Sequence, residues 1–175
     1  MGAIGKQVAK RARAFEMKVV AYDVAQDTGF AAQHGVQYAS LEQLLRESDF
    51  VSVHLFLDAK SFHMINAERL VLMKPTAYLI NTSRGGVIDS VALYHALKEK
   101  RIAGAALDVF EKEPLEPNSP LRTLENLCIS PHCSGASNDP RNAQIVMAAE
   151  NVLRIFRKEK PLYILNPEAL SSLRQ

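Results

Sequence analysis

Short apolar runs alternate with longer segments of helical periodicity along most of this chain. Each run is rich in β-branched and other apolar residues, which is typical of a parallel strand that is buried on both faces. The runs predict strands over residues 18–23, 50–55, 77–82, 103–109 and 127–130.

Between the runs, apolar positions recur three and four residues apart, a spacing that predicts helices. The predicted helices cover residues 1–18, 27–35, 41–49, 67–74, 90–100 and 139–160. Gly35 is placed to end the second helix and Pro75 to stop the fourth. Ser40 with Gln43 predicts a capping box, and Asp89 is the predicted cap of the fifth helix.

This alternation of strands and helices predicts βαβ units, and therefore an α/β fold with a doubly wound, Rossmann-type parallel sheet. No internal repeat or interior linker interrupts the pattern. We expect one domain over residues 1–160, followed by a C-terminal extension, residues 161–175, that docks elsewhere.

Composition narrows the class of protein. The chain has 175 residues, of which 47% are hydrophobic, enough for one domain with a buried core. A formal charge of +2 without a dense basic run argues against a nucleic-acid-binding surface. No apolar stretch reaches the roughly 20 residues that span a bilayer, nothing resembles a signal peptide, and two cysteines cannot form a disulfide framework. We therefore expect a cytoplasmic protein that binds neither nucleic acid nor membrane.

The basic N-terminus permits two targeting interpretations. Myristoylation of Gly2 would need Ser or Thr where Lys6 stands. A mitochondrial transit peptide would be rich in serine, and residues 1–18 contain none. The favoured alternative is a helix whose solvated face carries Lys6, Lys10 and Arg13.

The residues that end or follow the predicted strands include several with polar or charged side chains. They are Asp23, His54, Arg84, Asp108 and His132. Ligands of open α/β sheets bind outside the carboxyl ends of the strands, so these side chains predict one site. A packing role for His54 and a helix-capping role for Asp23 are alternatives. Arg84 is followed by two glycines, which suggests a backbone held close to a ligand.

A partial dinucleotide-binding fingerprint stands at the start of the chain. Gly2-x-x-Gly5 opens a helix and Asp23 ends the following strand, matching the later part of G-x-G-x-x-G plus an acidic residue. Gly2 would let the backbone approach a pyrophosphate, and Gly5 would let the helix pack closely on a strand. The helix N-terminus would offer free N–H groups to phosphate. Asp23 would accept hydrogen bonds from the ribose hydroxyls, which favours NAD over NADP.

Three further blocks resemble those of the D-2-hydroxyacid dehydrogenases. They are Ser-Arg-Gly-Gly-Val-Ile-Asp at 83–89, Ala-Gly-Ala-Ala-Leu-Asp-Val-Phe-Glu-Lys-Glu-Pro at 103–114, and Ser-Pro-His at 130–132. This family includes D-3-phosphoglycerate dehydrogenase and the glyoxylate and hydroxypyruvate reductases. The resemblance runs from Gly2 to about Leu170. It implies an oxidoreductase that uses NAD and acts on a small 2-oxo or 2-hydroxy acid.

The resemblance implies catalytic roles for Arg84, Glu113 and His132. Arg84 would bind the carboxylate of the 2-oxo acid and polarise its carbonyl. His132 would donate or remove the proton, and Glu113 would orient His132 and stabilise its charged form. Asp108 would lie near the nicotinamide. By matching position, the residues around the cofactor would be Gly2, Ala3, Ile4, Gly5, Asp23, Leu55, Phe56, Ser61, Thr82, Ser83, Asp108 and Ser134.

Some positions depart from the family pattern. Ala3 stands where many members have an arginine, and this removes a side-chain contact to phosphate. Phe56 and Asp58 replace a proline and a threonine that often follow His54. Asp58 would repel a pyrophosphate unless it points to solvent.

Cys128, His132 and Cys133 invite a metal-site interpretation. A zinc site of this kind needs three or four ligands, and the sequence holds no second cluster. We expect no metal, and we expect Cys128 to be a small core residue.

The fingerprint's first glycine would stand immediately before Met1, and the first strand before that. In the strand order 3-2-1-4-5-6 that strand is central, so its two neighbours would lose a ladder partner. We expect the coenzyme-binding part of a longer dehydrogenase, with the substrate domain largely absent and the isolated chain inactive or weak. Family members commonly dimerise through this domain, which implies a homodimer. The alternative is a non-catalytic dinucleotide-sensing or dimerisation module, resembling a corepressor.

Overall fold

The chain forms two compact units, Met1–His132 and Cys133–Gln175, in a computed structural model that describes residues 1–164, 166–168 and 170. The domain boundary expected at residue 160 stays a prediction. Residues 165, 169 and 171–175 of the expected extension lie outside the described residues.

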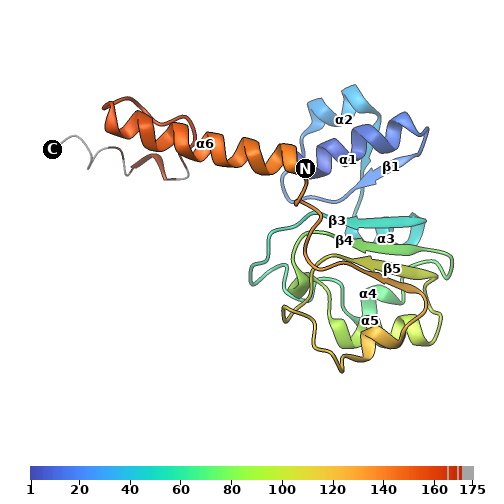
Figure 1. Ribbon diagram of the computed structural model, residues 1–175. Coiled ribbons are helices and arrows are strands. Elements are labelled where there is room, and N and C mark those ends of the chain that lie inside the picture. The colour runs from blue at the N-terminus through green and yellow to red at the C-terminus, as the bar shows by residue number, and fades with distance from the viewer. Residues whose placement is uncertain (165, 169, 171–175) are drawn as a thin grey trace. The chain divides into compact units, whose positions relative to one another are not determined.

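The Met1–His132 unit is built from parallel strands and helices (Figure 1). Its strands are β1 (Val19–Ala21), β2 (Val36–Tyr38), β3 (Phe50–Val53), β4 (Tyr78–Asn81), β5 (Gly104–Leu107) and β6 (Leu127–Ile129). β1 pairs with β2, and the other four form a sheet in the order β3-β4-β5-β6, with every pairing parallel. The predicted parallel α/β fold is confirmed. β2 was not predicted, because Val36-Gln37-Tyr38 is short and is interrupted by a polar residue, so it forms no apolar run.

Helices connect the strands. In this unit they are α1 (Ala3–Ala14), α2 (Thr28–His34), α3 (Leu41–Glu47), α4 (Ala67–Leu70) and α5 (Ser90–Lys98), with 3₁₀ turns η1 (Gly85–Val87) and η2 (Pro120–Thr123). The predicted helix over residues 67–74 is α-helical only to Leu70. Beyond it the amides of Leu72 and Met73 bond three residues back, a tighter turn that leads into Pro75.

The predicted helix ends are largely confirmed. Gly35 ends α2 at a φ of 63°, a left-handed conformation that suits glycine. Asp89 caps α5 by accepting hydrogen bonds from two amides of its first turn. The Ser40 hydroxyl accepts a hydrogen bond from the Gln43 amide at 3.1 Å, as predicted. The capping box is only half formed, because the Gln43 side chain donates to Glu47 and not back to Ser40.

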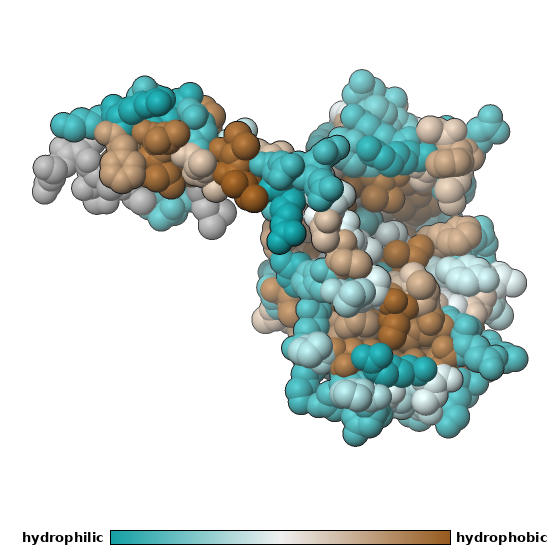
Figure 2. Space-filling view, in the orientation of Figure 1, coloured by the Kyte–Doolittle hydropathy of each residue, from teal (hydrophilic) through white to brown (hydrophobic). Residues whose placement is uncertain are grey.

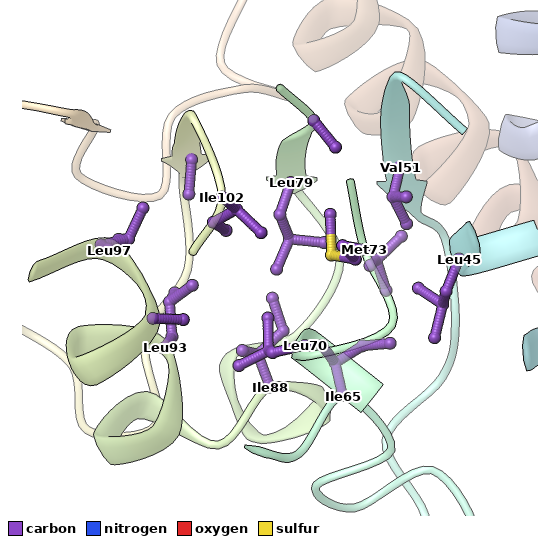
Figure 3. Packing of buried hydrophobic residues seen from close by; sticks show 14 of the residues in the cluster. Leu45, Val51, Ile65, Leu70, Met73, Leu79, Ile88, Leu93, Leu97 and Ile102 are labelled. Atoms are coloured by element: carbon purple, nitrogen blue, oxygen red, sulfur yellow. The ribbon is translucent and has the colours of Figure 1, made fainter. Parts of the chain in front are cut away.

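The main hydrophobic core lies between the four-stranded sheet and helices α3, α4 and α5 (Figure 3). Leu79 from β4, Leu93 and Leu97 from α5, and Ile102 before β5 are all essentially inaccessible to solvent. Burying a side chain of this size stabilises a fold by about 1.5–3 kcal/mol. The core therefore gives a rigid base to the strands whose carboxyl ends carry the polar residues.

β1 and β3 are edge strands of two separate sheets. Among the described residues, no strand pairs with β1 on the side away from β2, or with β3 on the side away from β4. The doubly wound order places one strand between them. Figure 2 shows hydrophobic residues of this unit exposed between two regions, one formed by α1 and β1 and the other by strands β3 to β5. In the described part of the chain, the backbone N–H and C=O groups on these edges of β1 and β3 therefore have no strand to pair with, and apolar surface beside them is exposed.

In its described residues, the Cys133–Gln175 unit contains one long helix and the segments that flank it. α6 spans Asn138–Phe156, close to the start of the predicted range and ending before it does. The segment after the helix folds back on it, because the Asn151 side chain bonds the backbone of Leu162 and Tyr163. Several apolar side chains of α6 remain exposed, including Ile145 and Phe156.

Candidate active site

The polar residues singled out in the sequence follow the carboxyl ends of parallel strands. His54 follows β3, Arg84 follows β4, Asp108 follows β5, and His132 follows β6. Because β3 to β6 run parallel in one sheet, these residues gather at a single edge of it.

The loop that carries Arg84 is shaped by Asn81, the last residue of β4. Asn81 is 1% exposed. Its side-chain oxygen accepts hydrogen bonds from the amide and hydroxyl of Ser83, and its amide group donates to the Arg84 carbonyl at 2.9 Å. The Arg84 guanidinium donates to the Ser83 carbonyl and forms no ion pair within the described part of the chain. It therefore retains donors for an incoming carboxylate.

Gly85 brings this loop against the segment that carries Glu113. A Cβ atom at Gly85 would lie 1.9 Å from the carbonyl carbon of Phe110 and 2.1 Å from its oxygen. No side chain fits there, so the backbones of the two loops touch.

His132 and Glu113 form a close pair. His132 Nδ1 lies 2.7 Å from Glu113 Oε2, and Glu113 Oε1 accepts a hydrogen bond from the Phe110 amide at 2.9 Å. These bonds, the one from His132 first, hold the pKa of Glu113 below its ordinary value against a smaller opposing effect of burial. No hydrogen bond to His132 Nε2 occurs among the described residues, so this nitrogen is available to a ligand.

A cavity of about 300 Å³ brings the three predicted catalytic residues together. Its wall includes Arg84, Glu113 and His132, together with Glu111, Leu57, Phe62, Gly85, Gly86 and Phe110. A second cavity of about 540 Å³ is also lined by Glu113 and His132, and otherwise mainly by apolar residues and Arg122. A small acid in the first cavity would meet a guanidinium and an imidazole at once.

Asp108 is buried beneath this edge of the sheet. It is 3% exposed, and the Ser130 hydroxyl donates a hydrogen bond to its carboxylate. Its amide also donates to the Asn81 carbonyl at 3.0 Å. Asp108 therefore links the ends of β4, β5 and β6.

The N-terminus of α1 has the character of a phosphate site. No side chain caps the helix at Gly2, and a Cβ atom there would meet nothing within 4 Å. A Cβ atom at Gly5 would lie 3.1 Å from Met1 Cγ and 3.9 Å from His54 Cβ, so Gly5 permits close packing. The amides of Ala3 and Ile4 lie in the same uncapped first turn.

Asp23 follows β1 and does not cap α2. Its carboxylate accepts a hydrogen bond from the Ala25 amide at 2.8 Å and lies 3.2 Å from the N-terminal ammonium. The α2 cap is Asp27, whose pKa is held low by a hydrogen bond from Lys6 and by the Phe30 amide. The alternative of Asp23 as a helix cap is therefore wrong. An uncapped helix start and a nearby carboxylate fit a dinucleotide.

The loop after β3 holds the predicted residues Leu55, Phe56 and Ser61. Phe56 is 89% exposed, while Leu55 is partly buried and packs against the core. Ser61 is buried, and its hydroxyl donates to the Phe56 carbonyl and accepts from the Asp58 amide. The Asp58 carboxylate accepts hydrogen bonds from the amides of Lys60 and Ser61, and its hydrogen bonds with Ser61 are the main cause of its lowered pKa. Asp58, which departs from the family pattern, thus stabilises the turn at residues 58–61 through these hydrogen bonds.

The remaining predicted residues differ in their surroundings. Thr82 is exposed beside the half-buried Ser83. His54 is half-buried with Ser52 at 3.0 Å from Nε2, and burial lowers its pKa, which agrees with the packing alternative. Ser134 belongs to the Cys133–Gln175 unit and stays a prediction.

Sequence reasoning missed Asn81 and the pair of His63 with Glu111. Asn81 ends an apolar strand, where a single amide side chain gives no distinct signal. His63 and Glu111 lie 48 residues apart, and only the fold brings them to 2.9 Å.

Two further expectations concern metal and membrane. Among the described residues, no group of three or more His, Cys, Asp or Glu side chains is placed to hold a metal ion. Cys128 is exposed, so its predicted core position is wrong; β6 is an edge strand and receives little cover in this unit. In the part of the chain that the structure describes, no helix combines the length and apolar character for crossing a membrane.

The parallel sheet, the helix N-terminus beside it and the polar edge define a Rossmann-type dinucleotide-binding domain. Residues 1–134 match the family model of the D-isomer specific 2-hydroxyacid dehydrogenase, NAD binding domain. The chain belongs to this family and carries its NAD-binding domain.

Several known proteins resemble the chain closely. A glyoxylate reductase from Korarchaeum cryptofilum is 49% identical over 170 residues, which are 97% of this chain and 51% of that protein. The crystal structure of the TT0316 protein from Thermus thermophilus matches with a TM-score of 0.88 at 39% identity, over 95% of this chain and 51% of that one. A dehydrogenase of this family from Lactobacillus delbrueckii ssp. bulgaricus, solved with NAD, gives a TM-score of 0.85 at 31% identity over 94% of this chain and 53% of that one. The chain spans about half the length of the curated relatives it matches.

Proposed function

We propose that this chain is the coenzyme-binding part of a dehydrogenase that interconverts a D-2-hydroxy acid and its 2-oxo acid with NAD(H). The observation that carries the proposal is the cavity in which Arg84, Glu113 and His132 meet within an NAD-binding domain. Glyoxylate is the first substrate to test, because several similar relatives are glyoxylate reductases.

The coenzyme would bind along the edge of the sheet. The uncapped start of α1, from Gly2 to Gly5, would hold the pyrophosphate of the coenzyme. Asp23 would accept hydrogen bonds from the ribose hydroxyls. Asp108, Thr82 and Ser83 would lie toward the nicotinamide end, with Leu55, Phe56 and Ser134 as further contacts. When bound, NADH supplies the hydride for the reduction.

Arg84 would bind the carboxylate of the 2-oxo acid. A guanidinium offers two parallel donors in a fixed plane, which suits a carboxylate and fixes its orientation. The wall that Arg84 shares with His132 would then place the substrate carbonyl near His132 Nε2.

His132 would donate a proton from Nε2 to the carbonyl oxygen as that oxygen gains charge. The 2-oxo acid gains one hydride and one proton and becomes the 2-hydroxy acid; the reverse direction returns the proton to His132. Glu113 would hold the imidazole by Nδ1 and stabilise its protonated form.

The unfilled place between β1 and β3 supports the further proposal that the isolated chain is inactive or weak. A parallel strand there would complete the sheet beside the start of α1. We propose that the active protein includes such a strand and a substrate domain, and that the substrate is selected largely by that domain. The codons directly upstream of Met1 test this: an open frame encoding a glycine after an apolar strand supports it, and a stop codon contradicts it.

The decisive assay is NADH oxidation with glyoxylate, hydroxypyruvate and phosphohydroxypyruvate. It uses an extended chain, in which this sequence is preceded by its own upstream residues or by the upstream half of the Korarchaeum relative. Turnover that is lost in Arg84→Ala and His132→Ala supports the proposal. NADH binding without turnover of any of the acids would instead favour a dinucleotide-sensing module.

Two further properties complete the proposal. The apolar side chains exposed on α6, such as Ile145 and Phe156, support a homodimer, which sedimentation of the extended chain would detect. The chain has only two cysteines, too few for a disulfide framework, which supports a reducing compartment such as the cytoplasm. Fractionation of cells that express the protein tests the location.

A further inference from the structure

A second histidine–carboxylate pair lies beside the candidate active site. His63 Nε2 is 2.9 Å from Glu111 Oε2, and His63 Nδ1 is 3.9 Å from a carboxylate oxygen of Asp89. The side chains of His63 and Glu111 are each 31% exposed, so they are shielded from much of the solvent. Glu111 also lines the cavity that holds Arg84, Glu113 and His132.

Glu111 connects two other parts of the chain through its two carboxylate oxygens. Oε1 accepts a hydrogen bond from the amide of Ser90, the first residue of α5, at 2.9 Å. Oε2 is held by His63. These hydrogen bonds together outweigh burial, which is the largest single effect and acts in the opposite direction, and leave the pKa of Glu111 below its ordinary value. The carboxylate is therefore charged and fixed at neutral pH.

Backbone hydrogen bonds join the same segments. The His63 amide donates to the Gly86 carbonyl at 2.8 Å, and the Ile65 amide donates to the Val87 carbonyl at 3.0 Å. Segment 63–65 is thus fixed to segment 86–89, which directly follows Arg84 and Gly85. The Glu111 side chain fastens the third segment, 110–113, to this pair.

We propose that His63 and Glu111 are positioning residues, which fix segment 110–113 so that Glu113 keeps its bonds to His132 and to the Phe110 amide. Glu111 and Glu113 are two residues apart in one short segment, so an unfastened Glu111 would let Glu113 move as well. The geometric part stands on this structure alone, whereas the effect on turnover rests on the proposed function.

The first test measures the ionisation of Glu113 in the chain itself. The carboxyl carbon of Glu113 is followed by ¹³C NMR as a function of pH in the parent, His63→Ala, Glu111→Ala and His63→Gln. The pKa of Glu113 is expected to rise toward its ordinary value in the two alanine variants, because its hydrogen bonds loosen. His63→Gln should keep the low value, since a glutamine amide can still donate to Glu111. An unchanged Glu113 pKa in both alanine variants would overturn the proposal.

Matched controls separate positioning from general damage. His95→Ala removes an exposed histidine on α5 that has no part in the three segments, and it should leave the Glu113 pKa at the parent value. If His63→Ala does not fold, His63→Asn carries the same expectation, because its shorter amide does not reach Glu111. A Glu113 pKa that moves equally in His95→Ala would also overturn the proposal.

The second test uses turnover of glyoxylate by the extended chain. His63→Ala is expected to lower kcat about 10- to 100-fold, the cost of a misplaced catalytic group, with a smaller change in the KM for NADH. The pH profile of kcat should change in His63→Ala and return to the parent form in His63→Gln. A parent extended chain without turnover overturns the proposed function, and the Glu113 titration then decides the positioning role alone.

Discussion

The segment from Phe110 to Glu113 carries two glutamates, and each is bonded to a histidine from a different part of the chain. Glu113 bonds His132 at 2.7 Å, and Glu111 bonds His63 at 2.9 Å. Both histidines have a positive φ, 54° for His132 and 48° for His63, which non-glycine residues adopt only uncommonly. The two pairs are therefore built alike in backbone and in partner.

They differ at the second ring nitrogen. His63 has carboxylates on both sides, since Asp89 lies 3.9 Å from Nδ1, and its side chain is 31% exposed. Within the part of the chain that the structure describes, His132 is bonded through Nδ1 only, and its side chain is 52% exposed. A histidine that exchanges a proton with a ligand needs one nitrogen held and one open. The same pairing thus supports catalysis at His132 and positioning at His63.

The largest expected effect separates the two histidines. In the extended chain, His132→Ala should lower kcat for glyoxylate about 10²- to 10⁴-fold, because general acid catalysis is lost. The effect of His63→Ala should be at least several-fold smaller. Both rates are measured from the loss of NADH absorbance, with NADH binding by fluorescence as the control. Equal losses in the two variants would contradict the division of roles.

Like His132, Arg84 keeps hydrogen-bonding groups available to a ligand. Arg84→Lys keeps the charge but loses the planar pair of donors that suits a carboxylate. Charge-assisted hydrogen bonds contribute about 1.5–3 kcal/mol, so kcat/KM for glyoxylate should fall on the order of 10- to 100-fold. The same variant should bind NADH like the parent. An unchanged kcat/KM would exclude Arg84 as the carboxylate-binding residue.

Gly85 tests the contact between the loops that carry Arg84 and Glu113. Gly85→Ala puts a Cβ atom 1.9 Å from the Phe110 carbonyl carbon, so the two backbones must separate. Overpacking of this kind costs about 1–3 kcal/mol or more in the free energy of unfolding, which urea denaturation measures. Gly2→Ala is the matched control, because nothing lies within 4 Å of its added Cβ. Similar stability of the two variants would show that the loops do not depend on this contact.

Much of the fold follows from local sequence signals. Apolar runs identified β3, β4 and β5, and β5 is indeed largely buried on both faces. The expected double cover fails for β3, where Phe50 and Ser52 lie on an exposed face, and in part for β4, where Tyr78 is exposed. Capping residues such as Ser40 and Asp89 placed helix starts, because each satisfies free amides of a first turn. The short strand β2 carries no such signal, and its pairing with β1 is set by tertiary contacts.

The site was predictable only in part. Their places after strands and within family motifs predicted Arg84, Glu113 and His132 as site residues, and in the structure all three line one cavity. The sequence could not assign Asn81 or pair His63 with Glu111, because those contacts depend on how distant loops meet. Likewise, the exposure of Cys128 depends on what covers an edge strand, which an apolar run does not reveal.

The smallest expected effect concerns the pH dependence of stability. Hydrogen bonds hold the pKa of Glu113 below its ordinary value, so the unfolded chain binds a proton more readily than the folded one. The stabilisation is therefore complete above the unfolded pKa of about 4.3 and is lost as pH falls through the lower, folded pKa. Glu113→Gln removes this linkage, so its free energy of unfolding should fall less steeply than the parent's below about pH 5. The carboxylate is about a third exposed, and solvent screening keeps the difference small. Urea denaturation at several pH values measures this difference. If the free energy of unfolding falls equally steeply with decreasing pH in parent and variant, the His132–Glu113 bond does not stabilise the folded chain.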